Sequence, residues 1–458
     1  MLAHKRKLLF MLGLCSFLAP FIGRSIDLCL PAIGNEFDMT IISLSWVITA
    51  YLLATAVLLV PFGRLADIIG RKKIFIAGSC FFTVTSFLCS IAYSGKFLIA
   101  ARILQGIASA MALGTATALL VTIFAPRERG KARGITTAGV YLGSSLGPSL
   151  GGIMTQYLGW RSLFVMTTLL STIVVIMSFL YLTEESTDAH GERFDVIGSI
   201  LYACATIALL YGTTMLPALT GYLVIAAGIA LFIIFGIAEE YIKHPVFDID
   251  LLLKNKAFAM SNLAALLNFS AAFAVPFLMS LYLQYIKGLA PKTAGLIILA
   301  SPITMVMGSP IAGRISDRID PRIVATFGMA CSSTALFMMS FVITPTTPLY
   351  LLMGILFIFG GGLSIFASPN ANAAMGVVSK KQLGIAASVL NTTRLFGQVI
   401  SMGISTLVLS LIVGKVEISD TVLPQLMKSI QLTFFIFGLL CFIGIFASLA
   451  RGQRTKEE

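Results

Sequence analysis

Long apolar runs, separated by short polar or charged stretches, cover almost the whole chain. Most of these runs reach 20 residues or more, which is the length an α-helix needs to cross the hydrocarbon core of a bilayer. Runs bounded by charge, glycine or proline predict fourteen spanning helices. Their ranges are 8–33, 42–66, 74–94, 97–124, 134–158, 161–183, 194–215, 219–242, 257–286, 293–313, 323–343, 347–378, 382–413 and 424–450.

The composition agrees with a multi-pass membrane protein. Of the 458 residues, 57% are hydrophobic and 11% are charged, whereas soluble domains carry about 25% charged residues. The run from Leu8 is too long for the apolar core of a signal peptide. The net charge of +12 does not indicate nucleic-acid binding, because the basic residues stand at the ends of apolar runs, where membrane topology explains them.

An even number of spans places both termini on one side of the membrane. Most Lys and Arg residues outside the spans fall on that side, so the positive-inside rule assigns it to the cytoplasm. The exceptions on the other side are Lys96, Arg161, Lys287, Lys292, Lys415 and Lys428.

A short internal repeat indicates two related bundles. The pattern G-R-x-x-D occurs after the second predicted helix, at 63–67, and again after the tenth, at 313–317. We therefore expect a six-helix bundle at 1–183, a linker with two inserted helices at 184–256, and a second six-helix bundle at 257–458.

Charged residues inside the predicted spans are few, and they are candidate functional groups because burying charge in a bilayer is costly. Away from the ends of the spans, in the expected hydrocarbon region, Asp27 is the only carboxylate and the basic residues are Arg24, Arg102 and Arg394. Arg24 and Asp27 are three residues apart on one helical face. They either neutralise each other as a structural pair, or Asp27 handles a proton or substrate.

Two other predicted helices carry distinctive polar or small residues. The fourth contains Arg102-Ile103-Leu104-Gln105-Gly106, and the fifth contains glycines at four-residue spacing around Pro148. Small residues at that spacing allow two helices to pack closely, and the proline favours a kink. The thirteenth carries Asn391, Arg394 and Gln398, which either line a central cavity or pack against carbonyl groups.

These motifs resemble the major facilitator superfamily, and in particular its fourteen-helix drug:proton antiporters of the EmrB/QacA type. The resemblance implies alternating access by two bundles and a proton-coupling role for Asp27 and Arg102, on helices 1 and 4 that face each other in this superfamily. By depth, both lie about 7 to 9 Å from the outer surface and could meet. The resemblance also implies a conformational latch formed by Gly63, Arg64, Asp67, Arg71, Gly313, Arg314 and Asp317. It assigns an antiporter motif to Gly139, Gly143, Gly147, Pro148, Gly151 and Gly152.

Helix 1 departs from the usual pattern of this family, and the departure bears on substrate. Asp27 stands only four residues before Pro31, and Arg24 is unusual. A cavity with one acid and as many as three arginines is poorly suited to a divalent cation. We expect neutral, zwitterionic, anionic or monocationic amphiphiles, with Arg24, Gln105, Asn391, Arg394 and Gln398 lining the substrate cavity.

The sequence favours one function over two others. The leading hypothesis is proton-coupled efflux of small amphiphilic compounds across the plasma membrane. The proton gradient would drive this transport, and no cofactor is expected. The alternative is an exporter or uniporter for one metabolite or lipid, without proton coupling through Asp27. A third, a transport-dead sensor, conflicts with the intact glycine and G-R-x-x-D motifs. The expected partners are the lipid bilayer, protons and substrate, with the protein a monomer. An enzyme, a nucleic-acid partner or a metal site is not expected, since histidines and cysteines lack any suitable pattern.

Overall fold

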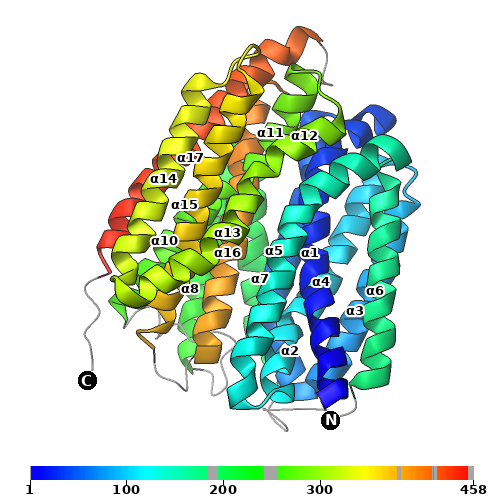
Figure 1. Cartoon of the computed structure of the whole chain (residues 1–458), viewed down its shortest axis with the longest axis vertical. Coiled ribbons are helices and arrows are strands. Elements are labelled where there is room, and N and C mark those ends of the chain that lie inside the picture. The colour runs from blue at the N-terminus through cyan, green and yellow to red at the C-terminus, as the bar shows by residue number, and fades with distance from the viewer. Residues whose placement is uncertain are drawn as a thin grey trace. The chain divides into compact units, whose positions relative to one another are not determined.

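The computed structural model describes residues 2–182, 194–241, 255–378, 383–414, 416 and 420–451, and every regular element in those ranges is helical (Figure 1). The first group of helices is α1 (Leu2–Phe37), α2 (Ile41–Ile69), α3 (Arg71–Ser90), α4 (Gly95–Ile123), α5 (Pro126–Leu158), α6 (Arg161–Tyr181), α7 (Val196–Thr214) and α8 (Leu219–Tyr241). The second is α10 (Lys256–Ala272), α11 (Val275–Leu281), α12 (Pro291–Ile298), α13 (Ala300–Arg318), α14 (Pro321–Val342), α15 (Leu349–Met375), α16 (Leu383–Ile412) and α17 (Leu423–Leu449).

Each of the fourteen predicted ranges contains helix in its described part. Within the described residues, thirteen helical segments are long and apolar enough to cross a membrane. The remaining range is α5, which has 33 residues but carries the charged stretch from Arg127 to Arg133 and many glycines. The all-helical membrane fold is therefore confirmed.

Two of the predicted spans are locally interrupted, although each still forms one membrane-length helical segment, Lys256–Ile286 and Pro291–Ser316. In the range 257–286, α10 ends at Ala272 and α11 begins at Val275, because Pro276 in the first turn of α11 has no backbone N–H to continue the ladder. A five-residue π-helix, Tyr282–Ile286, completes this segment. In the range 293–313, α12 and α13 are separated at Leu299, three residues before Pro302.

Helices α1 and α5 begin earlier than their apolar runs predict. The basic start of α1 extends to Leu2, where Lys5 Nζ lies 2.6 Å from Glu128 Oε2 in the first turn of α5. Helix α5 begins at Pro126 rather than at residue 134. Polar turns thus continue these helices beyond the apolar part of the sequence.

The chain forms two compact units. Unit 1 comprises Met1–Ala208, Ala227–Val246 and Ala290–Gly295, and unit 2 comprises the remaining segments. Within unit 1, α5 packs along α1, and α4 packs against α2 and α3. Within unit 2, α15 packs against α13 and α14, and α17 packs against α10 and α14. The predicted linker at 184–256 stays a prediction, since residues 184–193 and 242–254 lie outside the described part of the chain.

Candidate functional site

The glycines of α5 form a close helix–helix contact with α1, which is called the seam below. Added Cβ atoms at Gly139, Gly143 and Gly151 would collide with the backbone of α1, and one at Gly147 would meet the Cβ of Arg24. These positions recur every fourth residue, so they share one face of α5. The sequence predicted close packing here, and the structure identifies α1 as the partner.

Hydrogen bonds reinforce the same seam. Ser25 Oγ donates to the carbonyl oxygen of Gly147 at 3.0 Å. One turn further along α1, Cys29 Sγ lies 3.0 Å from Thr155 Oγ1. Both bonds are buried, and they flank Asp27 on α1, so α5 fixes the part of α1 that carries the charged pair.

The remaining antiporter-motif residues contact the start of α12. A Cβ atom on Gly152 would collide with the carbonyl of Pro291, and one on Gly295 would collide with the carbonyl of Pro148. Residues 290–295 belong to unit 1. The glycines at 152 and 295 thus allow a close backbone approach within this unit.

Asp27 is buried beside Arg24. Asp27 is 2% exposed. Arg24 Nη1 lies 3.9 Å from Asp27 Oδ2, and the Arg24 side chain is 24% exposed. The predicted pair is therefore formed, with the acid buried and the base partly open. Both a structural pair and a proton-handling carboxylate are compatible with this geometry.

Arg102 is fully buried in α4 and is held by several groups. Its Nε donates to the carbonyl oxygen of Val47 at 3.0 Å, and its Nη1 donates to Gln105 Oε1. Its guanidinium carbon lies 4.3 Å from the centre of the Tyr51 ring. Among the described residues, Arg102 Nη2 has no hydrogen-bond partner. The Nη2 group of this fixed arginine can therefore donate a hydrogen bond to a nearby anion.

Helix α4, which carries Arg102, packs against α1, which carries Asp27. The predicted proximity of α1 and α4 is therefore present, and it lies within unit 1. Gln105 extends this polar group, because its Nε2 donates to Ser86 Oγ of α3 at 2.8 Å. Sequence analysis missed Tyr51 and the Val47 carbonyl, since an aromatic residue and a backbone oxygen in an apolar run carry no charge signal.

The first G-R-x-x-D stretch joins three helices. Asp67 Oδ1 accepts from Arg71 Nη2 at 2.7 Å and from Arg71 Nε at 2.8 Å. Arg71 Nη1 also donates to Thr122 Oγ1 of α4 at 3.1 Å. Gly70, between α2 and α3, has a φ of 127°, a conformation that favours glycine. This arrangement ties the end of α2 to the start of α3, while Gly63 and Arg64 lie half-buried one turn earlier.

The second copy differs in its surroundings. Gly313 is half-buried and Arg314 is exposed on α13. The side chain of Asp317 lies outside the described residues. In the same turn, Ser316 Oγ accepts from Asn372 Nδ2 of α15 at 3.0 Å.

The polar residues of α16 share one face of that helix in unit 2. Asn391 and Arg394 are exposed, and Gln398 is half-buried. The guanidinium carbon of Arg394 lies 4.7 Å from the centre of the Phe269 ring in α10. This geometry favours an accessible cation over a side chain packed among carbonyl groups.

Comparison with known proteins connects this fold to transporters. The family model described as Major Facilitator Superfamily matches residues 12–238 and 261–458. The chain is 32% identical over 397 residues to the riboflavin transporter RibZ of Clostridioides difficile, covering 85% of each chain. It is 28% identical over 414 residues to the multidrug resistance protein Stp of Mycobacterium tuberculosis, covering 88% of this chain and 75% of that one.

Two further proteins resemble this chain. The methylenomycin A resistance protein of Streptomyces coelicolor is 29% identical over 387 residues, covering 82% of this chain and 80% of that one. The crystal structure of a bacterial homologue of the human lysosomal transporter Spinster aligns with a TM-score of 0.72 at 14% identity, over 98% of this chain and 97% of that one. At that identity the structural likeness concerns the fold alone.

Proposed function

Since this chain belongs to the Major Facilitator Superfamily, it is a multi-pass membrane transporter and not an enzyme, and we propose that it exports small amphiphilic compounds in exchange for protons. The observation that carries the proposal is the buried Asp27 beside Arg24, on a stretch of α1 seated against the glycines of α5. Relatives named as resistance proteins support export. The fourteen helical ranges support the EmrB/QacA type within the superfamily.

The proposed coupling follows from competing effects on one carboxyl group. Burial favours the neutral form of a carboxyl group, and nearby arginines favour the ionised form. Asp27 experiences both, because it is buried beside Arg24 and because α4, which carries Arg102, packs against α1. A movement of α1 that changes either effect would make Asp27 gain or release a proton. Alternating access then exposes this group to one side of the membrane at a time.

The proposed substrates follow from the excess of basic over acidic groups. Arg24 is half-buried and Arg394 is exposed, whereas Asp27, the acid beside Arg24, is buried. Neutral, zwitterionic, anionic and monocationic amphiphiles therefore fit better than dications. We place the protein in the plasma membrane as a monomer, with both termini in the cytoplasm and the proton gradient in place of a cofactor.

A second function is favoured by one specific relative. The 32% identity to a riboflavin transporter supports a carrier for a single metabolite. In that case Asp27 and Arg24 would be a structural pair, and transport would not depend on a proton bound at Asp27.

The test compares wild type with Asp27→Asn in proteoliposomes under an imposed proton gradient. Substrate movement and internal pH are followed together for a panel of amphiphilic drugs and for riboflavin. The matched control is Asp38→Asn, because Asp38 is exposed just beyond α1 and has a φ of 47°, which asparagine adopts readily.

We expect wild type and Asp38→Asn to move protons when drug is added, and Asp27→Asn to bind drug without moving protons. Transport of riboflavin alone, at equal rates in all three proteins and without proton movement, would replace the proposal with the single-metabolite carrier. Proton-coupled drug transport that persists in Asp27→Asn would remove Asp27 from the coupling step.

A further inference from the structure

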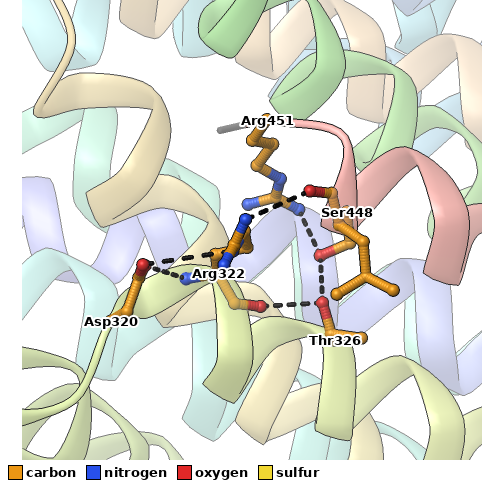
Figure 2. Close-up of polar contacts among 6 residues, drawn as sticks. Asp320, Arg322, Thr326, Ser448 and Arg451 are labelled. Carbon is orange, nitrogen blue, oxygen red and sulfur yellow. Dashed lines mark hydrogen bonds and ion pairs between the residues drawn. The ribbon is translucent and has the colours of Figure 1, made fainter. Parts of the chain in front are cut away.

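A pair of arginines lies at one end of unit 2, and one of them, Arg322, is close in sequence to the second G-R-x-x-D stretch. Arg322 stands in the first turn of α14, and Arg451 lies two residues after the last residue of α17. Figure 2 shows the two guanidinium groups near one another, with Asp320, Thr326 and Ser448 around them. Neither arginine belongs to the motifs that the proposed function uses.

A network of hydrogen bonds holds this pair in place. Arg451 Nη2 donates to Ser448 Oγ at 3.0 Å, and Ser448 Oγ lies 2.8 Å from Thr326 Oγ1. Thr326 Oγ1 donates in turn to the carbonyl oxygen of Arg322 at 2.7 Å. The ends of α14 and α17 are thereby fixed relative to each other, which makes the position of both arginines well defined (Figure 2).

Several donors of the pair have no hydrogen-bond partner in the part of the chain that the structure describes. Arg451 is only 6% exposed, yet its Nε and Nη1 have no hydrogen-bond partner among the described residues, and neither does Arg322 Nε. Burial lowers the pKa of Arg451 to about 10, against the opposing charge of Asp320. Buried donors on a charged group are costly when unpaired.

One carboxylate does not balance the two guanidinium groups. Asp320 Oδ2 lies 4.0 Å from Arg322 Nε, and Asp320 Oδ1 already accepts from the backbone N–H of Arg322 at 2.9 Å. Asp320 thus acts as the N-cap of α14. The two arginines and this one acid leave a local excess of positive charge.

The arginines border a hollow of about 40 Å³. Its wall also includes Ala257 and Ser261 near the start of α10, and Asn372 and Gly376 near the end of α15. The starts of α10 and α14 contribute partial positive charge and the ends of α15 and α17 contribute partial negative charge, so the positive charge of the hollow comes from the two arginines. All four helices are membrane-length segments or parts of them, so the hollow lies where such helices leave the bilayer.

We propose that this hollow binds a phosphate group, with Arg451 and Arg322 donating to its oxygens. A planar guanidinium matches the geometry of phosphate oxygens and can donate two parallel hydrogen bonds. A phosphate would satisfy the unpaired Nε and Nη1 of Arg451 and neutralise the excess charge. The group can come from the headgroup of an anionic phospholipid or from free phosphate. This inference is independent of the transported substrate.

The test measures the thermal unfolding temperature of the purified full chain in detergent. The additions are phosphatidylglycerol, phosphatidylcholine and inorganic phosphate, with chloride at matched ionic strength. The variants are Arg451→Gln and Arg322→Gln, and the control is Arg318→Gln, because Arg318 is an exposed arginine in the last turn of α13 that does not line the hollow. Native mass spectrometry counts retained lipid molecules in the same samples.

We expect phosphatidylglycerol to raise the unfolding temperature of wild type and Arg318→Gln, with apparent affinity about tenfold weaker or more in Arg451→Gln. A rise with lipid alone identifies a headgroup as the source, and a rise with inorganic phosphate as well identifies the free anion. Should Arg451→Gln fail to fold, Arg322→Gln provides the same comparison. Equal responses of the wild type and both pocket variants, or equal responses to phosphatidylcholine and phosphatidylglycerol, would overturn the proposal.

Discussion

Gly147 of α5 lies directly against Arg24 of α1, so that a Cβ atom on Gly147 would be 2.7 Å from the Cβ of Arg24. The contact is between a motif glycine and the partly exposed arginine that pairs with the buried Asp27. The same glycine accepts a hydrogen bond from Ser25 through its carbonyl oxygen. The position of Asp27 therefore depends on the absence of a side chain on α5.

Gly147→Val is expected to displace α1 and to abolish proton-coupled transport. Overpacking of a tight contact costs about 1–3 kcal/mol, so the unfolding temperature should fall as well. The matched control is Gly134→Ala, since a Cβ at Gly134 of α5 meets nothing within 4 Å. Transport in Gly147→Val at the wild-type rate would show that the seam does not position the charged pair.

Arg102→Lys is expected to reduce transport about tenfold or more. A lysine keeps the charge but cannot donate to the Val47 carbonyl and Gln105 together in the geometry that Arg102 uses, and hydrogen bonds involving a charged group contribute about 1.5–3 kcal/mol. Initial rates in proteoliposomes measure the effect. Arg133→Lys, at an exposed arginine of α5, should be indistinguishable from wild type; similar losses in both variants would contradict a specific role for Arg102.

Asp67→Asn is expected to slow transport several-fold with little loss of stability. The change weakens both bonds from Arg71, yet a partly exposed ion pair contributes only about 0–1 kcal/mol to folding. Lys73→Gln is the control, because Lys73 is an exposed basic residue in the same stretch. The assay is the initial transport rate beside the unfolding temperature, and an unchanged rate would rule out a latch at Asp67.

Arg394→Gln is expected to reduce transport of anionic compounds more than transport of neutral ones. Arg394 is exposed beside Phe269, so its charge is available to a ligand. Arg394→Lys keeps the charge and should preserve the preference. Competition between one anionic and one neutral substrate measures the selectivity, and equal effects on both would place Arg394 outside the substrate path.

The ion pair between Lys5 and Glu128 is expected to make a small contribution to the free energy of unfolding, and this contribution is lost at acidic pH. Lys5 lowers the pKa of Glu128 below its usual 4.5. A carboxyl whose pKa is lower in the folded state stabilises the fold above its ordinary pKa, and this contribution is lost as the pH falls through the lowered value. Glu128→Gln should remove that part of the pH dependence of the unfolding temperature below about pH 5. If the unfolding temperatures of wild type and Glu128→Gln depended on pH in the same way, the Lys5–Glu128 pair would not be maintained in solution.

Much of the molecule was predictable because the bilayer restricts what a sequence can do. Spanning helices need long apolar runs, so fourteen helical ranges could be located from hydropathy alone. The family followed from the paired G-R-x-x-D stretches and from the glycines of α5, and the Major Facilitator Superfamily match confirms it. The i, i+3 pairing of Arg24 and Asp27 required only helix periodicity.

Tertiary structure decided which surfaces these residues meet. Periodicity gave the glycine face of α5 but not its partner, since small residues permit a close approach by any neighbouring helix. The partners of Arg102 include a backbone oxygen and an aromatic face, which no charge pattern reveals. Arg322 and Arg451 are 129 positions apart by their numbers, and only the packing of α14 against α17 brings their guanidinium groups to one hollow. Local chemistry therefore fixed the helices, whereas the environment of each charge depends on contacts between distant segments.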